Sequence, residues 1–173
     1  MPSLLASEWA GLEEVASLLE PFALQTDILQ RDAQALSSII PSLLDLECHL
    51  QQHSAPKTLT SAMLRDFRQR FQTIMQPTAE DFNPLPAAAC LLDPSLLPVL
   101  LEPEQAALLH TAKAYVLQEC GCAPASTATT PATDDHTASP ALSRFRFLAT
   151  KMKVHERSAS STTTNLEAAC TAC

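Results

Sequence analysis

The sequence has very little glycine and few aromatic residues. Its 173 residues include only two glycines, Gly11 and Gly121, and aromatic residues make up 5% of the chain. A β-sandwich or a phosphate-binding loop needs more turn residues than this, so neither is expected. Hydrophobic residues make up 46%, and leucine, alanine, glutamine and glutamate favour helix. The sequence therefore predicts an all-α fold, an irregular bundle of about four to six helices.

Long apolar runs are also absent. No uninterrupted apolar stretch approaches the roughly 20 residues that cross a bilayer, and the opening MPSLLASEWAGLEE lacks the basic and apolar regions of a secretory signal. We therefore expect an intracellular protein without a membrane contact. In a reducing compartment its six cysteines are expected as thiols or metal ligands, not as disulfides.

Positive charge is scarce over most of the chain. Residues 1–110 carry fourteen acidic and five basic side chains, a net charge of -9 that does not hold a phosphate backbone by itself. The segment RFRFLATKMKVHER at 144–157 is basic instead, with aromatic residues between the charges. It predicts a nucleic-acid contact, a nuclear-import signal, a partner-binding helix or a solvated tail helix. The candidate contact residues are Arg144, Arg146, Lys151, Lys153 and Arg157.

Apolar residues recur about every 3.6 positions in several stretches, as expected for helices. The expected helices run from about Ser7, across Asp32–Gln52, Thr60–Met75 and Glu102–Glu119, and over Arg144–His155. In the first of them the apolar side consists of Trp9, Leu12, Val15, Ala16, Leu19, Phe22 and Ala23. Pro21 interrupts this helix and should kink it or divide it near Glu20, because proline lacks a backbone donor.

The composition divides the chain into four parts. Residues 1–120 are predicted to form a helical domain, and residues 121–141 a disordered linker rich in Ala, Ser, Thr and Pro. Residues 142–156 are predicted as a short basic helix, followed by a disordered Ser/Thr-rich tail at 157–173.

An acid lies within hydrocarbon in the stretch LLDPSLL at 91–97. Asp followed by Pro is typical of a helix start, because the carboxylate accepts hydrogen bonds from first-turn amides and proline presets φ. Asp93 is therefore predicted as a structural cap and not as a catalytic acid. Pro98 predicts that the helix after it is short or bent.

No set of residues predicts a catalytic centre. Two-metal chemistry needs carboxylates that converge from rigid elements. We do not expect the acidic pairs of this chain to converge in this way. Asp45 with Glu47 is predicted on a solvated helix face, Glu80 with Asp81 in a loop, and Asp134 with Asp135 in the disordered linker. The chain also lacks a G-x-S-x-G nucleophile turn. We therefore predict a protein that is not an enzyme and has no small-molecule substrate.

Histidine and cysteine pairs raise the question of metal binding. His49 and His53 are four residues apart, yet no third ligand is identifiable, so exposed helix histidines are expected. Cys120 and Cys122 with Cys170 and Cys173 would supply four thiolates for zinc, but no turn residues organise them. We predict no metal and no cofactor. Cys48 and Cys90, which lie in apolar periods, are predicted as buried fillers.

Four segments carry a family resemblance. WAGLEEVASLLEPFALQTDILQ (9–30), SSIIPSLLDLECHLQ (37–51), LRDFRQRFQ (64–72) and AAACLLDP (87–94) follow one another in this order. In order and spacing, residues 7–100 resemble the helical region of hAT-superfamily transposases and of their domesticated relatives, the BED-type zinc-finger proteins.

The resemblance implies a scaffold and not a catalyst. The family's catalytic domain holds two Asp and one Glu around divalent metal and carries a large helical insertion, and the matching residues lie in that insertion. We therefore expect a non-catalytic fragment or domesticated remnant, a helical protein- or DNA-associated scaffold that is nuclear by resemblance. One alternative is a partial gene model of a DNA-binding, transposase-like BED zinc-finger protein whose catalytic and dimerisation segments are missing here. Another is a helical adaptor unrelated to transposons.

Overall fold

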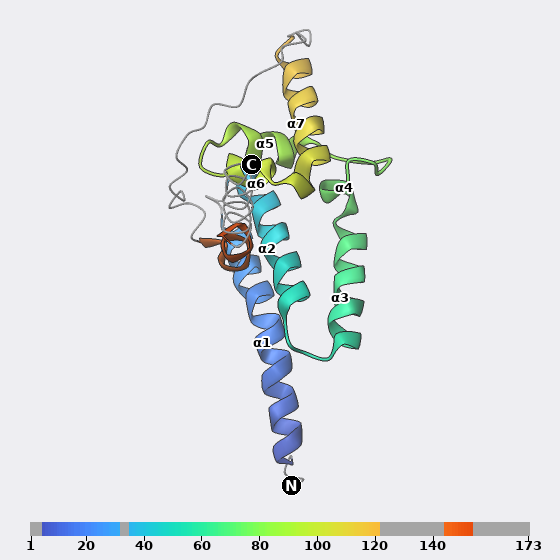
Figure 1. Ribbon diagram of the computed structural model, residues 1–173, viewed down its shortest axis with the longest axis vertical. Coiled ribbons are helices and arrows are strands. Elements are labelled where there is room, and N and C mark those ends of the chain that lie inside the picture. Colours follow the sequence, from blue (N-terminus) through green and yellow to red (C-terminus); the bar gives the residue numbers. More distant parts are fainter. Residues whose placement is uncertain (1–4, 32–34, 122–143, 154–173) are drawn as a thin grey trace, which may run out of the picture.

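The computed structural model describes residues 5–31, 35–121 and 144–153, and every regular element within them is helical (Figure 1). The helices are α1 (Ala6–Leu29), α2 (Ile39–Gln52), α3 (Lys57–Arg70), α4 (Gln72–Met75), α5 (Leu85–Leu92), α6 (Leu97–Leu101) and α7 (Ala106–Glu119). Two 3-10 turns, η1 (Leu36–Ser38) and η2 (Pro103–Gln105), precede α2 and α7, and residues 146–153 form a further helix. The predicted all-α bundle is confirmed. None of the described helices is both long and apolar enough to span a membrane.

Helix α1 runs unbroken through Pro21, so of the predicted kink or division near Glu20, the division is wrong. A proline inside a helix removes one hydrogen bond and crowds the preceding turn. Here the helix is held on both sides of Pro21, because Leu18 is fully buried and Phe22 packs against the same apolar cluster. Tertiary packing therefore outweighs the local cost of the proline.

Helix α2 forms the centre of the bundle and is buried on nearly all sides, as expected for a core helix. One side of it, with Ile40, Leu44 and Cys48, belongs to the larger core cluster. The other side belongs to a second cluster with α1 and α3, which contains Leu18, Leu43, Leu46, Leu50, Ala55 and Phe67. The helix begins at Ile39 and not at Asp32 as predicted, because η1 and an extended residue come before it.

The short helices α5 and α6 pack with α7 over one end of α2 (Figure 1). Ala87, Ala88 and Cys90 are buried on α5, and their small side chains let it approach both η1 and α7 closely. Helix α7 ends at Glu119, where Gly121 adopts a φ of 66° that glycine accommodates without strain. The predicted linker at 122–141 and the predicted tail at 157–173 lie outside the described residues.

The basic segment at 144–153 packs on the bundle. Phe145 is 2% exposed and Leu148 is 5% exposed, and both belong to the core cluster of Ile40 and Leu44. Burial of these two side chains excludes a helix that is surrounded by solvent, which was one of the four sequence-based interpretations. The described core therefore includes residues more than twenty positions beyond α7.

Candidate functional site

Asp45 binds the start of the 146–153 helix. The residue lies in the middle of α2 and is 3% exposed, so its predicted place on a solvated face is wrong. Its Oδ1 accepts hydrogen bonds from the backbone N–H groups of Phe147 at 2.7 Å and Leu148 at 2.8 Å. First-turn amides have no partner within their own helix. Asp45 therefore supplies the cap that Phe145, an apolar residue, cannot provide.

Two opposing effects act on the Asp45 carboxyl group. Burial raises its pKa above the ordinary value, because a charged form is costly away from water. The amides of Leu148 and Phe147 oppose this shift because they bind the ionised form. A carboxylate at a helix N-terminus is also favoured by the helix dipole. The residue thus has a structural partner that accounts for its burial.

His49 lies one turn after Asp45 and is also buried, at 4% exposed, so the prediction of an exposed histidine is wrong for it. Its Nε2 lies 3.0 Å from the carbonyl oxygen of Leu18 on α1, a distance at which a protonated Nε2 donates a hydrogen bond. The ring centroid lies 4.5 Å from that of Phe147. His49 therefore joins α1, α2 and the 146–153 helix at one point.

Burial is also the main cause of a lowered pKa at His49. The Leu18 carbonyl and Asp45 partly offset this effect, while His53 and Arg146 add to it. The neutral form is therefore favoured at pH 7, in agreement with one ring nitrogen facing a carbonyl oxygen. His53 is half-buried, and no group of three metal-ligating side chains comes together among the described residues.

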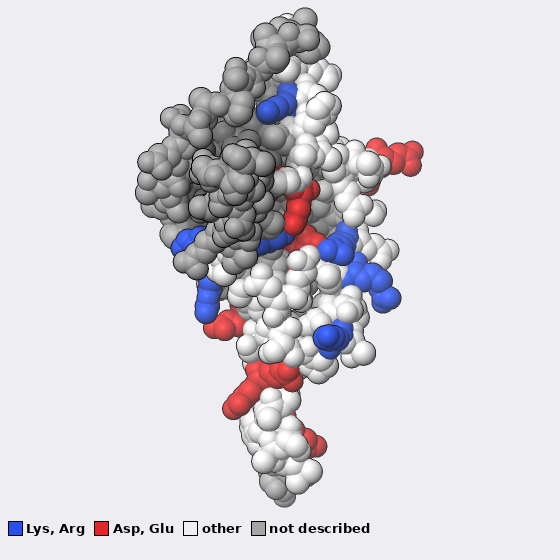
Figure 2. All heavy atoms as spheres, in the orientation of Figure 1, with Lys and Arg blue, Asp and Glu red and all other residues white. Residues whose placement is uncertain are grey.

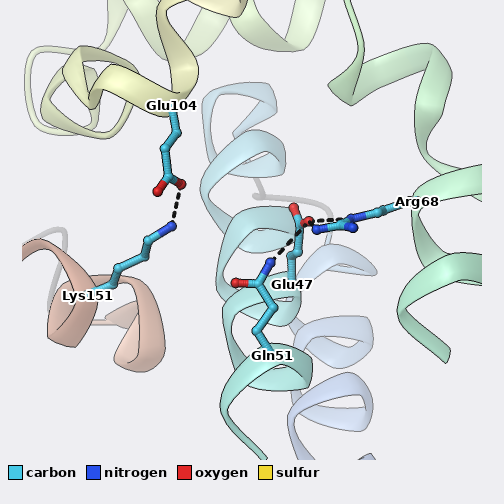
Figure 3. A network of polar contacts seen from close by, with 5 residues as sticks. All are labelled: Glu47, Gln51, Arg68, Glu104 and Lys151. Carbon is cyan, nitrogen blue, oxygen red and sulfur yellow. Dashed lines mark hydrogen bonds and ion pairs between the residues drawn. The ribbon is translucent and has the colours of Figure 1, made fainter. Parts of the chain in front are cut away.

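A polar network lies on the other side of α2 (Figure 3). Arg68 on α3 forms an ion pair of 2.6 Å with Glu47 on α2, and Gln51 contacts the same carboxylate. Lys151 on the 146–153 helix forms an ion pair with Glu104 on η2. These groups line a cavity of about 230 Å³. One pair links α2 to α3 and the other links the 146–153 helix to η2, so most charged groups of this cavity are paired.

Four of the five candidate contact residues lie within the described residues, and their environments differ. Lys151 is half-buried and paired with Glu104. Arg144 and Arg146 are exposed and lie over the rings of Phe145 and Phe147, at 4.8 Å and 5.8 Å from the ring centroids. Lys153 is exposed at the end of the described segment, and Arg157 lies outside the described residues.

Asp93 organises the turn between α5 and α6. Its carboxylate accepts hydrogen bonds from the backbone and hydroxyl of Ser95 and from the hydroxyl of Ser37 on η1. The Ser95 hydroxyl is the largest cause of its lowered pKa. The next helix begins at Leu97 and not at Pro94, so the Ser95 amide that the Asp93 carboxylate binds belongs to the turn before α6. Helix α6 has five residues, as short as Pro98 predicts.

The remaining predicted residues have separate environments. Cys48 and Cys90 are buried, as predicted, and burial raises the pKa of Cys90 to about 12, so its thiol is poorly reactive. Glu80 and Asp81 are exposed in the loop before α5. Cys120 is exposed at the end of α7. Five candidate ligands lie outside the described residues, namely Cys122, Asp134, Asp135, Cys170 and Cys173.

The feature that sequence reasoning missed is an exposed apolar face on the first half of α1. The predicted core side of this helix is largely the exposed side: Leu5 is 67% exposed, Trp9 56%, Leu12 51%, Val15 40% and Leu19 45%. The buried side, centred on Leu18 and Gln25, lies about half a helical turn away.

This exposed face is bordered by acids. Helix α1 contains Glu8, Glu13, Glu14, Glu20 and Asp27 and no lysine or arginine. Figure 1 shows that the N-terminal half of α1 extends beyond the other helices, and Figure 2 shows acidic and uncharged but no basic side chains on the visible side of this extension. The extension therefore combines apolar and negative character.

Comparison of the chain with protein-family models, with curated proteins and with solved structures gives no match. The fold and the exposed face define a helical protein with one helix side that lacks a partner within the described chain.

Proposed function

We propose that this chain is a helical scaffold protein that binds a partner protein through the exposed apolar face of α1, formed by Leu5, Trp9, Leu12, Val15 and Leu19. The exposure of these five large side chains along one helix is the observation that carries the proposal. A contiguous apolar patch on a protein surface is typical of an interaction site, whereas scattered apolar residues are not. Tryptophan is also enriched among residues that dominate binding energy.

The rest of the bundle supports this role by holding α1 in place. Leu18 is fully buried against α2, and its carbonyl oxygen faces Nε2 of His49 at 3.0 Å. A helix that is already formed and anchored loses little conformational entropy when a partner binds. The bundle therefore anchors α1 at Leu18, next to the part of the helix that carries the exposed face.

We also propose, from the sequence resemblance alone, that this scaffold derives from the helical insertion region of a hAT-type transposase. Association with DNA and a nuclear location belong to the same proposal. The exposed Arg144, Arg146 and Lys153 would give at most a weak, salt-sensitive contact with phosphates. The genomic neighbourhood tests this origin. Neighbouring reading frames that encode the parts of a transposase catalytic domain with the two Asp and the Glu would favour the partial gene model instead.

Site-specific cross-linking tests the binding function. A photoreactive amino acid replaces Leu12 on the exposed face, and in the control it replaces Leu24, which is 58% exposed but lies off that face. We expect one recurrent protein adduct from position 12 in cells, none from position 24, and loss of the adduct when Trp9→Asp is added. Equal labelling from both positions, or no adduct from position 12, would contradict the proposal.

A further inference from the structure

The exposed face of α1 has the spacing of a coiled-coil seam. Trp9, Leu12, Ala16 and Leu19 follow one another at intervals of three, four and three residues, and Leu5, which immediately precedes α1, lies four residues before Trp9. This alternation is the heptad pattern by which two helices pack side by side. Ala16 is exposed together with the larger residues of the seam. The face is therefore shaped to receive another helix along its length.

The charged residues that flank this apolar seam determine which kind of helix can bind it. Glu8 borders one side, and Glu13 and Glu20 border the other, at the flanking positions that form ion pairs between coiled-coil helices. Two parallel copies of α1 would place Glu8 of one against Glu13 of the other. Two antiparallel copies would also bring acids of the same flank together. Like charges at these positions are destabilising, so a second copy of this chain is a poor occupant.

We propose that the face binds an amphipathic helix of another protein with an apolar heptad seam and lysine or arginine at the positions that flank it. This inference rests on the proposed function, since it names the chemistry of the partner for the same face. The apolar seam supplies most of the attraction, and the three glutamates select a basic helix over an acidic one.

Two synthetic helical peptides with the same leucine seam test this selection, one with lysine and one with glutamate at the flanking positions. The full chain reports binding through Trp9, its sole tryptophan, whose emission shifts to shorter wavelength when its 56% exposed ring leaves water. We expect a Kd about tenfold lower for the lysine peptide than for the glutamate peptide, and a smaller difference in high salt.

Charge reversal provides the matched test. Glu13→Lys with Glu20→Lys should invert the preference between the two peptides, whereas Glu80→Lys with Asp81→Lys changes the net charge equally in an exposed loop and should leave it unchanged. Glu8 is kept because its carboxylate accepts the backbone N–H of Leu5 at the start of α1. Leu12→Ala should weaken binding of the lysine peptide about tenfold, and Leu24→Ala should not.

Each other outcome overturns the inference in a recognisable way. Equal binding of both peptides, with loss in Leu12→Ala, would retain the apolar face but refute selection by charge. No binding of either peptide, with a recurrent adduct at position 12, would refute a helical basic partner and leave the proposed function standing. If the chain self-associates and this shifts the Trp9 emission, the face binds a second copy and the proposed partner is refuted. If removal of residues 154–173 changes the Trp9 emission, the face binds that segment of the same chain, which also refutes the proposed partner.

Discussion

At the scale of single residues, buried polar side chains connect parts of the chain that are far apart in sequence. Asp45 accepts two amide hydrogen bonds from residues about a hundred positions away, and His49 reaches a carbonyl group on α1. Both residues were predicted on a solvated helix surface. Their identity is explained by the unpaired backbone groups that face them, because such groups are costly when buried.

Removal of the Asp45 cap should loosen the 146–153 helix. We expect Asp45→Ala to lower the free energy of unfolding by about 2 kcal/mol, since two first-turn amides lose their acceptor. Urea denaturation measures the loss, and faster hydrogen exchange at Phe147 and Leu148 locates it. Asp66→Ala, which removes an exposed carboxylate paired with Arg70 within α3, is the control and should change stability little. Similar losses in both variants would refute the cap.

The buried His49 should make the fold sensitive to mild acid. Its pKa is lower in the folded chain than in the unfolded chain, chiefly through burial, so the unfolded state takes up a proton first as the pH falls. Stability should therefore decrease as the pH falls from the ordinary histidine pKa through the lower folded value. His49→Gln should lose part of this decrease. Denaturation curves at several pH values between 7 and 5 measure the difference, and identical pH dependence in both chains would contradict it.

Sequence reasoning fails at these residues for a definite reason. The alternation of apolar positions in α2 is visible in the sequence, and it correctly placed Cys48 in the core. The burial of Asp45 and His49 depends on the 146–153 helix, which lies far along the chain, and the residues near either side chain do not indicate this contact. Asp93 was assigned a structural role from the local Asp-Pro pair, although the element it orders is a turn and its partner Ser37 lies far away in the sequence.

At the scale of helices, α1 shows that an apolar sequence pattern does not by itself determine which side of a helix is buried. Its predicted apolar stripe is largely exposed, and the sequence does not reveal that another side of the helix packs on α2. The choice is made by Leu18 and Phe22, which meet apolar residues of α2 and α3. The stripe that contains Trp9, the sole tryptophan of the chain, is left exposed.

Pro21 provides a test of how strongly packing supports α1. Proline in a helix interior costs up to about 3 kcal/mol relative to alanine, so we expect Pro21→Ala to raise the free energy of unfolding by about 1 to 3 kcal/mol. Pro103→Ala, at the first position of η2 where no internal hydrogen bond is lost, is the control and should change it little. A destabilised Pro21→Ala chain would show that the proline ring itself is required for packing.

At the scale of the whole molecule, the 146–153 helix belongs to the same core as the helices before residue 120. Phe145 and Leu148 share a cluster with Ile40, Val99 and Leu108, which come from three other elements. The composition of the chain predicts a basic helix at this place but not its attachment, since periodicity gives the apolar side of a helix without naming what covers it.

This shared core should make unfolding cooperative across the gap in sequence. We expect Leu148→Ala to lower the free energy of unfolding by about 2 to 4 kcal/mol, with one transition for helical signal and for Trp9 emission together. The control is Lys153→Ala, an exposed change near the end of the same helix. Separate transitions, or an unchanged stability of α1 and α2 in Leu148→Ala, would show that the segment is an independent attachment.

Hydrogen–deuterium exchange of the full chain, with and without the lysine-flanked peptide, tests the central claim most directly. Without peptide, the amides of 146–153 should already be protected, because this helix is capped by Asp45 and packed on the core. With peptide, protection should increase over residues 5–19 and remain unchanged over 146–153. Added protection over 146–153, or no change over 5–19, would contradict the assignment of α1 as the partner-binding helix.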